Sequence, residues 1–76
     1  MIGELETVVL GRDLPEHGLR RGDVGAVVHA YADGAAYEVE FVAADGSTVA
    51  VLTLRAGDVR PMGEREILHV RALDAA

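Results

Sequence analysis

The stretch Tyr37-Glu38-Val39-Glu40-Phe41-Val42 alternates apolar and acidic residues and decides the fold. Successive side chains of a β-strand point to opposite faces, so this period of two predicts a strand with one buried and one polar face. Asp33-Gly34 precedes the stretch and Asp45-Gly46 follows it. Both pairs are typical of tight hairpin turns, because aspartate and glycine tolerate positive φ. The centre of the chain is therefore expected to be a β-meander.

Runs of β-branched and apolar residues on either side of this centre predict further strands. These runs are Leu5–Leu10, Asp23–Tyr31, Thr48–Leu54 and the brief Val59–Pro61. Thr48–Leu54 is apolar on both faces, so we expect it to be central or covered. Gly25 lies inside the second run, which indicates a bulge or a close backbone approach. Pro61 places the last run at a sheet edge, since proline cannot donate a ladder hydrogen bond.

The connections are a long loop and a single tight turn. Residues 12–22 contain Pro15 and two glycines, which predict an irregular surface loop with Leu14 and Leu19 as its anchors in the core. Residues 55–58 are too few for an α-helix and predict one 3₁₀ turn.

Short strands with these connections predict an all-β fold, a small five-stranded SH3-like barrel over residues 1–63. Residues 64–76 form a C-terminal tail, in which Leu68 and Val70 alternate with His69 and Arg71. We expect this tail to be extended, as an extra strand or a partner-binding segment.

The chain has 76 residues, of which 50% are apolar and only three are aromatic, and it has no cysteine. A domain of this size buries a modest fraction of its surface, and no disulfide or thiolate zinc site can support it. An interface with another chain is the remaining source of stability.

Thirteen acidic and seven basic residues give a net charge of −6, and every basic residue is arginine. This balance disfavours nonspecific nucleic-acid binding and favours encounter with basic partners. No apolar run approaches the roughly 20 residues that span a bilayer, and the first residues lack the features of a signal peptide. We therefore expect a cytoplasmic protein that does not bind membranes.

Three segments carry a resemblance to a known family: Asp13-Leu14-Pro15-Glu16, Gly22-Asp23-Val24-Gly25 and Glu66-Ile67-Leu68-His69. Together they resemble the bacterial family catalogued as domain of unknown function 4926. The resemblance implies an SH3-like fold. Members are often encoded beside another small protein, an arrangement similar to toxin–antitoxin pairs, which implies a partner-binding role. Residues 22–28 are also similar to the glycine-centred turn of KOW domains and of nitrile hydratase β subunits.

No residue pattern points to catalysis, a metal or a cofactor. His17, His29 and His69 lack ligand spacing, and tetrahedral sites need three or four convergent ligands. Glu38 and Glu40 share a solvated strand face, which does not separate carboxyl pKa values as acid–base catalysis requires. We therefore expect a protein that is not an enzyme, without metal or cofactor.

The leading hypothesis is a non-catalytic protein-interaction module that binds a protein partner or a second copy, with an antitoxin as its specific version. Its contacts would come from the loop and the tail: Asp13, Leu14, Glu16, His17, Leu19, Ile67, Leu68, His69, Val70 and Arg71. One alternative is a KOW-like nucleic-acid-binding barrel that uses Arg12, Arg20 and Arg21. A small accessory subunit of a larger enzyme is another.

Overall fold

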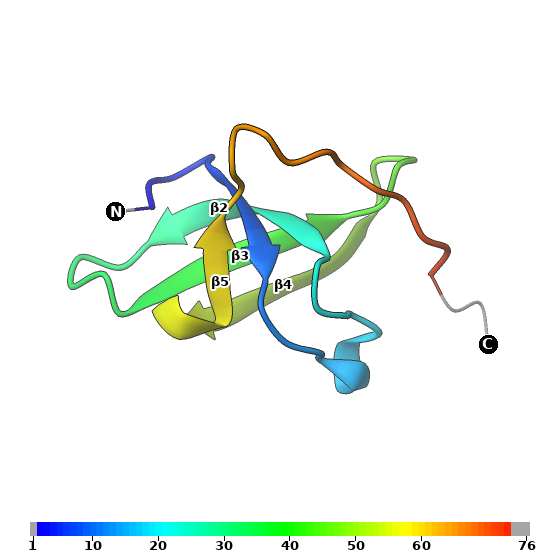
Figure 1. Ribbon diagram of the computed structural model, residues 1–76. Coiled ribbons are helices and arrows are strands. Elements are labelled where there is room, and N and C mark those ends of the chain that lie inside the picture. The colour runs from blue at the N-terminus through cyan, green and yellow to red at the C-terminus, as the bar shows by residue number, and fades with distance from the viewer. Residues whose placement is uncertain (1, 74–76) are drawn as a thin grey trace.

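Residues 2–73, as described by a computed structural model, form one five-stranded antiparallel sheet (Figure 1). The expected all-β architecture is confirmed, and the predicted runs coincide with the observed strands to within a few residues. The strands are β1 (Thr7–Leu10), β2 (Val24–Ala30), β3 (Ala36–Val42), β4 (Thr48–Arg55) and β5 (Val59–Pro61).

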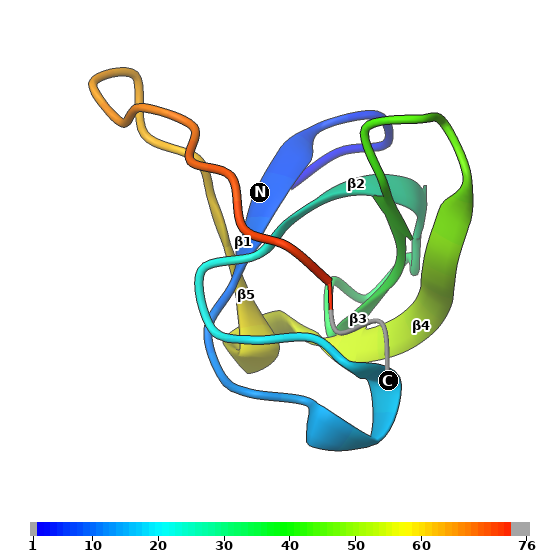
Figure 2. The same cartoon turned by 90° about the vertical axis from the view of Figure 1, so that its right-hand side faces the viewer.

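The sheet is curled but is not closed into a barrel by hydrogen bonds. Its strand order is β4-β3-β2-β1-β5, so β4 and β5 are the two edges. Figure 2 looks along the curled sheet and shows its strands wrapped around a common interior. The expected closure therefore fails at the seam between β4 and β5. A reason is that β5 has three residues and ends at Pro61, which has no N–H to donate.

The central meander is as predicted. Tyr37, Val39 and Phe41 are buried, whereas Glu38 and Glu40 are only partly covered on the opposite face. Each hairpin turn carries its glycine at positive φ, 70° in the turn at Asp33-Gly34 and 88° in the turn at Asp45-Gly46. The period-two pattern and the turn chemistry therefore suffice to place β3 and its register.

Gly25 allows β2 and β3 to pack closely. A Cβ atom built at this position would lie 2.7 Å from Val39 Cγ1 and 3.0 Å from the Glu40 carbonyl oxygen. The expectation of a close backbone approach is confirmed. A bulge also occurs in β2, but further along: Val27 pairs with Val39 and His29 with Glu38, which leaves Val28 as the extra residue.

Thr48–Leu54 was expected to be central or covered, and the first alternative is wrong, because β4 lies at the edge of the sheet. Its inner face packs on the core through Leu54 and, in part, Leu52, while Val51 on the outer face is 50% exposed. A strand that is apolar on both faces is usually buried on both sides, but its sequence does not show which element buries each side.

The core joins residues from the sheet and from the long loop. Within that loop, Pro15–His17 form a 3₁₀ turn, η1, and Leu14 and Leu19 are bridged to each other and buried as predicted. The buried cluster comprises Ile2, Val8, Leu10, Leu14, Leu19, Val27, Tyr37, Val39, Phe41, Leu54 and Val59. A second 3₁₀ turn, η2 (Ala56–Asp58), precedes β5, again as predicted. In the part of the chain described here, no helix is long and apolar enough to span a membrane.

Candidate protein-interaction surface

The tail continues from β5 and crosses back over the sheet. Residues 62–73 contain no strand and no helix, so in this range the tail does not form the extra strand that was one of its expected roles. Residues 74–76 of the predicted tail lie outside the described residues. In Figure 1 the tail, coloured orange to red, arches over the strands and descends beside the turn between β3 and β4. It is attached to the sheet at two places.

The first attachment is a clamp between Arg60 of β5 and Glu66. Arg60 Nη1 and Nη2 donate to the two carboxylate oxygens of Glu66, each at 2.7 Å. The Gly63 N–H donates to the same carboxylate at 2.6 Å. The bonds from Arg60 and then from Gly63 lower the pKa of Glu66 from 4.5 to about 2. A bidentate arginine–carboxylate pair fixes orientation as well as distance, so it sets the direction in which the tail leaves β5.

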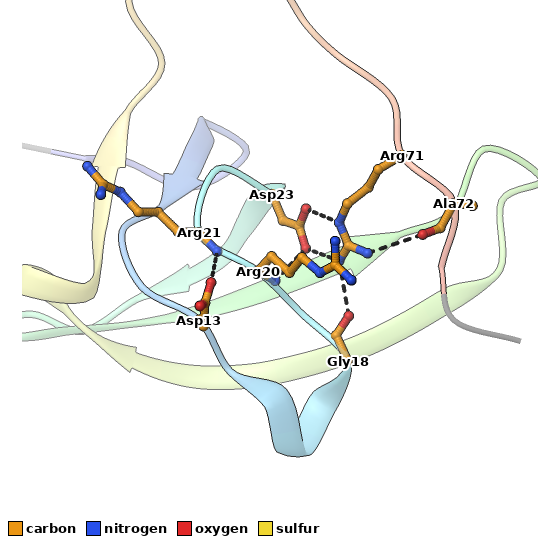
Figure 3. Close-up of polar contacts among 7 residues, drawn as sticks. All are labelled: Asp13, Gly18, Arg20, Arg21, Asp23, Arg71 and Ala72. Atoms are coloured by element: carbon orange, nitrogen blue, oxygen red, sulfur yellow. Dashed lines mark hydrogen bonds and ion pairs between the residues drawn. The ribbon is translucent and has the colours of Figure 1, made fainter. Parts of the chain in front are cut away.

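The second attachment joins Arg71 to the start of β2 and to the long loop (Figure 3). Arg71 Nε donates to Asp23 Oδ1 at 2.8 Å, and Nη2 donates to Asp23 Oδ2 at 2.5 Å and to the Gly18 carbonyl at 3.0 Å. The Arg20 N–H also donates to Asp23, at 2.8 Å. The bond from Arg71 is the main cause of a lowered pKa of Asp23, and the Arg20 amide adds to it. The side chains of Asp23 and Arg71 are partly buried, with 18% and 25% of their surface exposed.

Residues 67–70 lie between the two clamps and are open to solvent. Ile67 is 84% exposed and Val70 is 95% exposed. Within the described range 2–73, the backbone N–H and C=O groups of residues 67–70 make no hydrogen bonds. This segment therefore offers apolar side chains and solvent-exposed backbone groups that have no partner in residues 2–73, and both of its ends are held.

A groove runs beneath the tail. It has a volume of about 560 Å³ and lies between the tail, the start of β2 and the turn from β3 to β4. Its walls include Val24, Phe41 and Val49 from the sheet and Leu68 and Leu73 from the tail. The groove is mostly apolar, with Asp23 and Arg71 as the charged groups in its lining.

The loop and tail residues predicted as partner contacts divide into three groups. Leu14 and Leu19 are buried, so they hold the loop in place and are not available to a partner. Glu16 and His17 are exposed in η1, and the Asp13 carboxylate accepts the Arg21 N–H at 2.8 Å. The tail residues Ile67, Leu68, His69 and Val70 are exposed, and Arg71 forms the clamp.

Sequence reasoning missed the residues that join loop and tail. Asp23 and the Gly18 carbonyl hold Arg71, although Asp23 is 48 positions away from it in the chain. No local pattern signals such a pairing, because an arginine and an aspartate are common surface residues whose meeting depends on the path of the tail.

The three arginines of the nucleic-acid alternative do not converge on one site. Arg12 Nε donates to Asp58 at 2.9 Å, and this bond raises the pKa of Arg12. Arg20 and Arg21 side chains make no ion pair with any residue of the described range. Figure 3 shows the Arg20 and Arg21 side chains extending in different directions from the loop.

The polar face of the sheet is engaged in cross-strand hydrogen bonds. Glu38 accepts from Thr53 Oγ1 and, at 3.0 Å, from Tyr31 Oη, and these two bonds lower the pKa of Glu38. Glu40 accepts from Thr48 Oγ1 at 2.8 Å. His29 packs edge-on against Tyr31, with ring centroids 4.8 Å apart. Among residues 2–73, no group of three or more histidine, aspartate or glutamate side chains is placed to hold a metal ion.

The molecule is thus a small antiparallel all-β domain with a clamped, apolar tail. The chain belongs to the family described as Domain of unknown function (DUF4926), whose sequence profile matches residues 4–61. No curated protein matches the chain, and no solved structure matches it. The family match ends where β5 ends, so the tail lies beyond the matched part, although the clamps join it to Arg60 and Asp23 within that part.

Proposed function

We propose that this protein is a non-catalytic protein-interaction module whose binding segment is residues 67–70. The observation that carries the proposal is the combination of exposed apolar side chains and unpaired backbone between two arginine–carboxylate clamps. Holding both ends lowers the entropy that binding would otherwise cost, so the segment is prepared for a partner.

The segment is best suited to bind a protein that has an exposed strand edge or an apolar groove. An extended segment with unpaired N–H and C=O groups can add to a neighbouring sheet, which supplies hydrogen bonds, while alternate side chains supply specificity. The net charge of −6 favours encounter with a basic surface. A protein encoded beside this one, as the family arrangement implies, is the partner to test first, with an antitoxin role as the specific version.

The SH3-like interpretation of the fold belongs to the same proposal. The strand order β5-β1-β2-β3-β4, the long loop after β1 and the 3₁₀ turn before β5 support it. Barrels of this type present loops and edges to other chains and fill their interior with side chains, which leaves little room for a substrate.

The experiment measures binding between the full chain and the product of the neighbouring gene by calorimetry, with an Ile67→Asp variant. The expected result is a dissociation constant raised by about tenfold or more, because a charge replaces a contact at the centre of the segment. Leu5→Asp is the matched control: Leu5 is also 84% exposed but lies outside the tail and the groove. Its dissociation constant should equal that of the unmodified chain.

Two outcomes would contradict the proposal. One is the absence of binding by the unmodified chain together with failure to rescue growth when the two proteins are co-expressed. The other is an equal loss of affinity in Ile67→Asp and Leu5→Asp, which would assign binding to overall charge.

A further inference from the structure

The two edges of the sheet differ in how well they are protected against pairing with another strand. β5 has three residues, ends at Pro61, and its Arg60 is held by Glu66. β4 has eight residues, and between Thr48 and Leu54 it contains no proline and no charge. Sheet edges in monomeric proteins are usually shortened, charged or covered, because unpaired backbone invites association. From Thr48 to Leu54, β4 has none of these protections.

No described element covers the outer edge of β4. Its extensive contacts are with β3 alone, and from Thr48 to Leu54 its backbone makes no hydrogen bonds outside that pairing in residues 2–73. In Figure 2, β4 runs along the margin of the curled sheet. Alternate N–H and C=O groups of this strand therefore face outward without a partner.

We propose that β4 pairs with β4 of a second copy of this chain, in antiparallel orientation about a two-fold axis at Val51. Residues directly opposite each other in an antiparallel ladder share a face, so a continuous sheet requires outer-face residues to meet outer-face residues. An axis at Val51 meets this requirement and brings the two half-exposed valines together.

The same register is complementary in charge. β4 has a bulge, because Phe41 pairs with Ala50 and Val42 with Thr48, so Val49 is the extra residue. With this bulge counted, Thr53 falls opposite Thr48 of the second copy, and Arg55 falls beside the second copy's β3–β4 turn. Asp45 lies in that turn and supplies a carboxylate near Arg55 of the other copy.

Arg55 is exposed at the end of β4, where its backbone N–H donates to Asp58 Oδ2 at 3.1 Å. It makes no ion pair with another residue in the range 2–73. Each copy carries a net charge of −6, which opposes association, so a cation at each end of the seam offsets part of the repulsion. The pairing would also reduce the exposure of Val51, because each valine would pack beside its counterpart.

The test is the mass of the full chain in solution, measured by light scattering over a range of concentrations up to about 1 mM. The unmodified chain should reach twice its mass of 8.0 kDa. Val51→Lys should remain at the mass of one chain, because the two lysines would meet at the axis. Val28→Lys adds the same charge at a valine that is 42% exposed on β2, away from the edge, and should still dimerise.

Hydrogen exchange gives a second measurement that needs no variant. Amides of residues 48–54 should exchange more slowly at high than at low protein concentration, whereas those of the short β5 edge should not change. Ile67→Asp should dimerise as the unmodified chain does, so this inference can fail or succeed independently of the proposed function.

Three results would overturn the inference. They are a single-chain mass for the unmodified protein at the highest concentration, undiminished dimerisation of Val51→Lys, and loss of the dimer in Ile67→Asp.

Discussion

The sheet and the tail are held by different forces. The sheet is stabilised by a continuous core in which Val8, Val27 and Val39 are completely buried. The tail from Gly63 to Val70 has no buried residue and is held by two arginine–carboxylate clamps. Burial of apolar surface is insensitive to salt, whereas ion pairs at the surface weaken as salt rises or a carboxylate is protonated. The sheet should therefore persist under conditions that release the tail.

Folding of the sheet and the proposed binding by the tail therefore depend on different residues. The family match covers the sheet and ends before the tail. A segment that contributes nothing to the core can change its side chains or its position without unfolding the domain. The proposed binding by the tail can therefore be tested with substitutions that leave the sheet folded.

The largest expected effect comes from the core. Phe41→Ala should lower the free energy of unfolding by about 3–5 kcal/mol, because it removes a buried ring and leaves a cavity, and this can unfold a domain of this size. Val42→Ala changes the next residue, which is 49% exposed, and should cost below about 1 kcal/mol. Urea denaturation followed by circular dichroism distinguishes them, and equal midpoints would contradict the assignment of Phe41 to the core.

A smaller effect is expected where β2 meets β3. Gly25→Ala should cost about 1–3 kcal/mol, because the added methyl would be 2.7 Å from Val39 Cγ1 and must displace packed atoms. Gly57→Ala is the control, since a Cβ there meets nothing within 4 Å and its φ is not positive. Melting temperatures measured for both should show a loss only for Gly25→Ala. A loss of the same size at Gly57 would contradict close packing as the cause at Gly25, because the entropic effect of Gly→Ala on the unfolded chain is stabilising.

The smallest effect concerns the first clamp and leaves the sheet intact. The pKa of Glu66 in the folded chain lies below its ordinary value of 4.5, at about 2, so the clamp is fully present above pH 4.5 and is lost as the pH falls through about 2. Carbon NMR of the Glu66 carboxyl group should show this titration, and tail signals should sharpen as the clamp opens. In Arg60→Gln the carboxyl group should titrate nearer 4.5. Titration of the unmodified chain at 4.5 would show that the clamp does not form in solution.

Much of the sheet could be predicted because its signals are local. The alternation in residues 37–42, the Asp-Gly turns and the interior Gly25 each report a backbone geometry within a few residues. The same reasoning failed for β4, because an apolar run on both faces does not show whether a strand lies at the centre or at the edge of its sheet. It also failed for closure, which depends on whether the two most distant strands of the sheet meet.

The candidate surface could be predicted only in part. The tail was singled out because its apolar residues lie after the last strand, and the structure places Ile67, Leu68 and Val70 in solvent. Leu14 and Leu19 were predicted both as core anchors and as partner contacts. Because both side chains are buried, they can act only as core anchors.

Amino-acid patterns are enough to establish an all-β domain, its strands, its turns and an apolar tail, because each depends on neighbours in the chain. The meeting of Arg71 with Asp23, the unpaired edge at β4 and the open seam with β5 depend on residues far apart in sequence. Such meetings follow from how the sheet curls and where the tail crosses it, and the curl is a property of the packed core as a whole.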